Sequence, residues 1–183
     1  MSFHPTTQRL ILRAPMLSDV NAVVAALNDY DVAKNLRLVP HPYTEAMYRD
    51  RLADIDAERR NGTSFSFAVT RAMDGAFIGF CSIDRRGDDD MWEFGYWYGR
   101  PYWGQGYATE AARPVLRFAF EDVGVQALAA GWYFDNPASG HVLDKLGFRA
   151  TGIARVHCVS RGCEVVSNRV QLTRDQFARK KAA

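Results

Sequence analysis

The sequence lacks any apolar run long enough to span a bilayer, and its first residues, MSFHPTTQRL, contain no apolar core of the kind found in signal peptides. Cysteine is scarce, with only three residues, at positions 81, 158 and 163. A small, odd number of thiols without an export signal is typical of reduced thiols in the cytoplasm. We therefore expect a cytoplasmic protein without a disulfide framework and without membrane contacts.

An excess of charge of one sign is also absent. The chain carries 23 Lys and Arg against 21 Asp and Glu, a net charge of +2, which disfavours a nucleic-acid partner. The chain has 183 residues, of which 48% are hydrophobic and 24% charged, which is enough to form a hydrophobic core. No repeat, linker or low-complexity segment interrupts them. We expect one domain over residues 1–183, with about 175–183 as a frayed C-terminal tail.

Hydrophobic periodicity predicts the element order β, α, α, β, β, β, α, β, α, β, β. The predicted strands cover residues 8–14, 64–70, 76–83, 91–98, 125–134, 150–159 and 163–172. Thr44 is placed to cap the second helix, and Asn136 to cap the fourth, with Pro137 at its first position. Pro114 lies inside the third helix and is expected to kink it, because proline has no N–H to donate. The order predicts an α/β fold with a mixed sheet and helices on its faces.

The segment GRPYWGQGYATEA, residues 99–111, joins the predicted strand 91–98 to the third helix. Glycine turns at helix N-termini often bind phosphate, because unpaired N–H groups point into the turn. A dinucleotide fingerprint needs a third small residue where Thr109 stands, and a Walker loop needs a Gly-Lys-Ser/Thr run that is missing. The remaining alternatives are a turn that merely ends a strand and a turn that holds a phosphate without cleaving it.

This segment resembles the pyrophosphate-binding motif Q/R-x-x-G-x-G/A of the GNAT superfamily of N-acetyltransferases, with Trp103 replacing the first Gln or Arg. The form Y-W-G-x-G-Y-A-T-E-A is similar to the branch that contains the RimJ/RimL-type ribosomal-protein N-terminal acetyltransferases and many relatives. Four further segments, TQRLILRAPMLSD, PHPYTEAMYRDRL, WEFGYWY and NPASGHVLDKLGF, resemble parts of that branch. The resemblance implies the GNAT fold: one mixed, largely antiparallel sheet of about seven strands, splayed between strands 4 and 5 and flanked by about four helices.

The resemblance implies acetyl-CoA as co-substrate, with no metal. Its pyrophosphate would lie at the glycine turn, where Gly104 and Gly106 have no Cβ to obstruct it. Its pantetheine arm would run along strand 91–98. The implied cofactor-binding residues are Tyr96, Trp97, Tyr98, Trp103, Gly104, Gln105, Gly106, Tyr107, Ala108, Thr109, Asn136, Ser139 and Lys145.

Two residues are catalytic candidates within this resemblance. Strand alternation places Glu93 on one face with Gly95 and Trp97, and Glu93 is the predicted general base, acting directly or through water. A sheet-face carboxylate paired with an arginine is the alternative. Many members carry a tyrosine acid where this chain has Leu143, so Ser139 becomes the predicted hydrogen-bond donor to the leaving thiolate.

The acceptor is predicted to be a primary amine, either a protein N-terminus or a small molecule, and Arg37, Tyr43 and Trp92 are the predicted contacts. The alternative function is a non-catalytic acyl-CoA-binding or sensing module. His157 and Cys158 alternate to opposite strand faces, which disfavours zinc binding. An exposed edge strand and the C-terminal hairpin are compatible with a homodimer.

Overall fold

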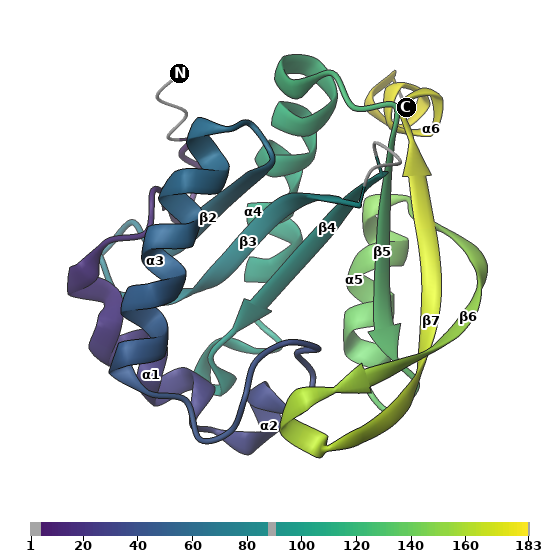
Figure 1. Cartoon of the computed structure of the whole chain (residues 1–183). Coiled ribbons are helices and arrows are strands. Elements are labelled where there is room, and N and C mark those ends of the chain that lie inside the picture. Colours follow the sequence, from purple (N-terminus) through teal and green to yellow (C-terminus); the bar gives the residue numbers. More distant parts are fainter. Residues whose placement is uncertain (1–4, 88–90, 183) are drawn as a thin grey trace.

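Seven strands form a single sheet in the computed structural model, which describes residues 5–87 and 91–182 (Figure 1). The strand order is β1-β2-β3-β4-β5-β7-β6, and every neighbouring pair is antiparallel except β4 and β5. The strands are β1 (Leu10–Arg13), β2 (Ser64–Arg71), β3 (Phe77–Arg86), β4 (Met91–Tyr98), β5 (Ala127–Tyr133), β6 (Arg149–Cys158) and β7 (Cys163–Thr173). The predicted mixed, largely antiparallel sheet is confirmed.

Helices cover both faces of the sheet (Figure 1). They are α1 (Val20–Leu27), α2 (Tyr30–Ala33), α3 (Glu45–Arg60), α4 (Tyr107–Arg117), α5 (Pro137–Leu146) and α6 (Arg174–Ala182). Between them lie the short turns η1 (Leu17–Asp19), η2 (Arg100–Tyr102), η3 (Phe118–Val123, π-helical) and η4 (Val159–Arg161). The predicted caps are confirmed, since the Thr44 side chain accepts from the Met47 N–H and that of Asn136 from the Ser139 N–H. Each such cap is worth about 1 kcal/mol.

The two faces of β4 belong to different cores. Even-numbered residues such as Phe94 and Tyr98 pack against α4 and α5 in the larger core. Trp97 points to the other face, where it packs with Phe80 against residues of α1 and the loop before α3, including Val23 and Tyr43. Strand β4 therefore separates two environments, and the alternation of its side chains decides which one each residue enters.

Strands β4 and β5 separate along their length. They are paired only at Trp92 with Leu128 and at Glu93 with Ala129. Beyond these two pairs, β4 continues to Tyr98 and β5 to Tyr133 without pairing with each other. On its other side, every residue of β4 pairs with β3. The predicted splay between strands 4 and 5 is thus present, and it leaves one edge of β4 facing a gap.

Three expectations differ from the structure. The tail predicted to fray from about residue 175 forms helix α6, because Phe177 stacks on Phe120 with ring centroids 4.8 Å apart. Strand β3 runs on to Arg86, three residues past its predicted end, because these residues pair with β4. The described residues hold six α-helices rather than about four, since α2 and α6 were not expected.

Helix α4 continues through Pro114 to Arg117 before the π-helical turn η3 begins. The kink expected at Pro114 stays a prediction. All three cysteines are free thiols, with Cys81 and Cys158 buried. None of the helices in the described ranges combines the length and apolar character needed to cross a bilayer.

Candidate active site

One continuous cleft of about 1130 Å³ crosses the molecule at the gap between β4 and β5. Its lining includes Gly104 and Gly106 of the glycine turn, Ser139 of α5, and Glu93 and Tyr43 on the face covered by α1 and α3. The cleft exists because β4 and β5 stop pairing after Glu93, so no ladder closes the sheet there. It connects the turn at the start of α4 to the opposite face of the sheet.

The glycine turn is built from left-handed backbone. Gly104 has φ +72° and Gly106 has φ +81°, a region that side chains with a Cβ rarely adopt. Gly106 is the N-cap of α4, and its carbonyl accepts the first helical hydrogen bond from the Glu110 N–H at 3.1 Å. The N–H groups of the preceding residues in the first turn have no acceptor within the helix. Together with the helix dipole, they make this turn suited to an anion.

Two side chains hold the turn in place. The Trp103 indole Nε1 donates to the Tyr98 carbonyl at 2.7 Å, and the Gln105 side-chain amide donates to the Pro101 carbonyl at 2.7 Å. The first bond ties the turn to the end of β4 and explains a tryptophan at the first position of the motif. Trp103 and Gln105 therefore shape the turn through their own side chains.

Glu110 anchors the first turn of α4 to the segment that leads into β1. Its carboxylate accepts from the Thr7 hydroxyl at 2.6 Å and from the Arg9 main-chain N–H and Nε at 2.9 and 2.7 Å. Burial alone would raise the pKa of Glu110, but the hydrogen bonds from Thr7 and Arg9 outweigh it and lower that pKa. The position of the glycine turn thus depends on a contact between residues about one hundred positions apart in sequence.

The start of α5 forms the opposite wall of the cleft. Asn136 caps the helix, and Ser139 follows in its first turn. The Ser139 Oγ lies 2.8 Å from the Tyr96 hydroxyl of β4, and the Tyr96 hydroxyl also lies 3.1 Å from the Ser139 carbonyl. Leu143 is buried in the core at 1% exposure. The phenol beside Ser139 is therefore that of Tyr96 on β4, whereas α5 has Leu143 at the position where many family members carry a tyrosine. The sequence did not reveal this contact.

Glu93 lies on the α3 face of β4 between two arginines. Arg86 Nε donates to Glu93 Oε2 at 3.1 Å, and Arg169 Nη2 donates to Oε1 at 3.2 Å. The Glu93 side chain is 19% exposed. The predicted alternative, a sheet-face carboxylate paired with arginine, describes these contacts, and they leave the general-base role a prediction.

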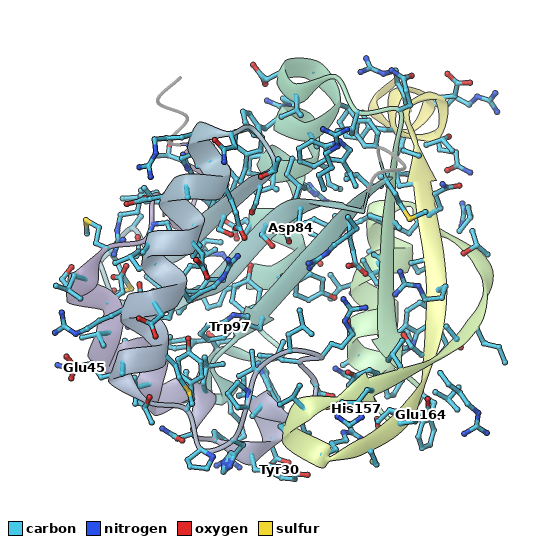
Figure 2. All side chains as sticks on the ribbon, in the orientation of Figure 1. Tyr30, Glu45, Asp84, Trp97, His157 and Glu164 are labelled. Carbon is cyan, nitrogen blue, oxygen red and sulfur yellow. The ribbon has the colours of Figure 1, made fainter. Side chains whose placement is uncertain are left out.

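Asp84 is a second carboxylate beside Glu93 that the sequence analysis did not identify. The two residues are directly paired across β3 and β4. Asp84 accepts from the Ser64 hydroxyl at 2.6 Å and from the Ser82 hydroxyl at 2.9 Å, and all three line the cleft. Figure 2 labels the Asp84 side chain on β3. The predicted third strand ended at residue 83, so Asp84 and Arg86 lay outside it. The pairing of the two strands was the missing signal.

The other predicted site residues separate into two groups. Arg37 and Tyr43 line the cleft, as do Tyr96, Trp97 and Lys145. Trp92 does not: it is 8% exposed and stacks on Phe65 in the core behind the sheet. Trp92 lies where β4 still pairs with β5, so its side chain is enclosed in the core, whereas Tyr96 beyond the last pair reaches the cleft. The predicted contact of Trp92 with the acceptor finds no support in this placement.

Comparison with known proteins assigns the family. Residues 9–149 match the model of the acetyltransferase (GNAT) domain. The uncharacterized N-acetyltransferase p20 of Bacillus licheniformis is 26% identical over 158 residues, which cover 85% of this chain and 88% of that protein.

Solved structures show the same fold. The ribosomal-protein-S5-alanine acetyltransferase from Vibrio fischeri superimposes with a TM-score of 0.82 at 19% identity, covering 96% of this chain and 98% of that one. Mycobacterium smegmatis RimJ in complex with CoA-disulfide gives a TM-score of 0.78 at 19% identity, covering 94% and 89%. The splayed sheet, the glycine turn at the start of α4 and the match over residues 9–149 lead to one conclusion: the chain belongs to the GNAT family and is an N-acetyltransferase.

Proposed function

We propose that the protein transfers the acetyl group of acetyl-CoA to a primary amine, a protein N-terminus or a small molecule, within a ternary complex. The main support for this proposal is that one continuous cleft connects the anion-suited turn to the α3 face of the sheet. Acetyl-CoA would be held with its pyrophosphate at the turn and its pantetheine arm at the open edge of β4, and the amine would approach from the side of Glu93. RimJ with bound CoA-disulfide shares the fold, which supports this assignment.

The cleft residues fit each step of such a transfer. An amine attacks a thioester only after losing its proton, and Glu93 is the proposed acceptor of that proton, directly or through water. The new C–N bond forms, the C–S bond breaks, and the electron pair leaves with sulfur. The Ser139 hydroxyl is the proposed hydrogen-bond donor to that sulfur. Direct transfer is supported by the cleft lining, which includes no cysteine among the described residues.

The test is thiol release from acetyl-CoA against a panel of small primary amines and N-terminal peptides. We expect release that depends on the acceptor and saturates with it. Binding of CoA without any acceptor-dependent release would favour the alternative, a non-catalytic acyl-CoA-binding module.

We expect Gly106→Ala to raise the Kd for CoA about tenfold. The left-handed backbone of Gly106, with φ +81°, costs an alanine about 1–2 kcal/mol, and a loop that relieves this strain displaces the N–H groups that would face the phosphates. Calorimetric titration with CoA measures the change.

Gly124 supplies the matched control at the other end of the same helical segment. Its φ is +86°, and a Cβ there meets nothing within 4 Å. Gly124→Ala should lower the Tm comparably and leave the Kd for CoA unchanged. Equal affinity losses in both variants would mean that stability, and not the turn, explains the effect.

A further inference from the structure

Tyr96 joins the two walls of the cleft through its hydroxyl. It lies on β4, and its contact with Ser139 of α5 spans 43 positions of sequence. This is the point at which β4 and β5 have already separated, so no ladder hydrogen bonds hold these two walls together there. The link between the walls at Ser139 is the pair of contacts to its Oγ and carbonyl, at 2.8 and 3.1 Å.

The ring of Tyr96 is held on both sides by aromatic neighbours of its own strand. Phe94 and Tyr98 lie with ring centroids 5.6 and 6.2 Å from it. Burial raises the pKa of Tyr96, and the hydrogen bond with Ser139 only partly offsets this. The phenol therefore stays protonated throughout the neutral pH range, and it can act as a donor there.

The two hydroxyls hold two protons, which can be arranged in two ways. With the cleft empty of ligand, the phenol proton can point to the Ser139 carbonyl, and the serine proton to the phenol oxygen. When the phenol proton points to Ser139 Oγ instead, the serine proton is free to point into the cleft. The second arrangement turns Ser139 into a donor directed away from Tyr96.

We propose that Tyr96 is a positioning residue that donates to Ser139 Oγ and so directs the Ser139 proton toward the sulfur of the leaving thiolate. The inference rests on the proposed function, in which Ser139 faces that sulfur. Each hydroxyl keeps its own proton: the C–S electron pair moves to sulfur, the hydrogen bond stabilises the charge, and the thiolate is released or protonated by solvent. A serine oxygen that also accepts a hydrogen bond is a stronger donor than one that does not.

The experiment measures kcat and the KM for acetyl-CoA in Tyr96→Phe, Ser139→Ala and the double variant. We expect Tyr96→Phe to lower kcat about tenfold, the effect of one lost hydrogen bond, with little change in KM. The double variant should be no slower than Ser139→Ala alone, because Tyr96 acts only through that serine. A tyrosine that merely stabilises the fold would change the Tm without this non-additivity.

Thr70→Val is the matched control. The buried Thr70 hydroxyl donates to the Ile11 carbonyl at 3.2 Å and Thr70 is not part of the cleft lining, so this variant also loses one buried hydroxyl hydrogen bond. It should lower the Tm without changing kcat.

Two outcomes would overturn the inference. One is an unchanged kcat in Tyr96→Phe. The other is a double variant in which the fold-losses of kcat of the two single variants are multiplied together. The slow hydrolysis of acetyl-CoA without any amine releases the same thiolate, so the four proteins are compared in that reaction as well. A chain that hydrolyses acetyl-CoA but accepts no amine from the panel would refute the proposed acceptor class, while the comparison would still decide the role of Tyr96.

Discussion

Glu93→Gln is expected to lower the acceptor-saturated rate by about 10²-fold or more, the range found when a general base is lost. Glutamine has nearly the same shape and still accepts a hydrogen bond from an arginine, but it cannot take a proton from an ammonium. Steady-state rates of thiol release across pH at saturating acetyl-CoA provide the measurement.

Arg169→Gln separates this role from a structural one. The substitution removes the ion pair between Arg169 Nη2 of β7 and Glu93 Oε1 of β4, which lie 3.2 Å apart. The carboxylate of Glu93 keeps its contact with Arg86. If Glu93 is the base, this variant should lose far less activity than Glu93→Gln. Equal losses would identify Glu93 as an ion-pair partner that supports the sheet, and an unchanged Glu93→Gln rate at every pH would remove it from the chemistry altogether.

Ser139→Ala should lower kcat by about 10²-fold with little change in the KM for acetyl-CoA, because a donor aimed at charge that develops on the leaving group acts mainly in the transition state. The substitution keeps the main-chain N–H that bonds to Asn136 Oδ1 at 3.3 Å, so the cap of α5 remains. Ser139→Thr retains the hydroxyl and should recover most of the rate. Pre-steady-state thiol release distinguishes the chemical step from product release.

Ser160→Ala provides a comparison outside the cleft. The Ser160 Oγ donates to the Ala33 carbonyl at 2.9 Å at the tip of the β6–β7 hairpin. Its loss removes one partly buried serine hydrogen bond of similar length, and the rate should stay at the wild-type value. Undiminished turnover in Ser139→Ala would show that the departing thiolate needs no donor from this serine.

The elements that carry the site were readable from local sequence. Strand β4 begins and ends at its predicted residues, 91 and 98, because a run rich in aromatic residues with alternating burial favours an extended strand. Two glycines directly before a helical run predicted the turn at residues 104–106, where left-handed backbone requires them. Asn136 followed by proline predicted the start of α5, since capping involves only residues within one turn.

The partners of the candidate catalytic groups were decided by tertiary structure. Arg169 reaches Glu93 from 76 positions away because β7 lies next to β5 in the sheet, and no local pattern encodes strand order. Asp84 stands beside Glu93 because the two strands pair in one register. The placement of Trp92 has a related reason, since alternation shows which residues share a face, but the point at which β4 separates from β5 decides which of them reach the cleft.

The sequence by itself determined the glycine turn and the residues on each face of β4, because propensity, capping and alternation act over a few neighbouring residues, and it indicated the family through the resemblance of its motifs. Only the tertiary structure decided that β4 and β5 separate after two residue pairs, and that Tyr96 meets Ser139 across the gap. It also decided that the last residues form α6 on Phe120. These features depend on packing between segments far apart in the chain, where burial and hydrogen bonding outweigh local preference.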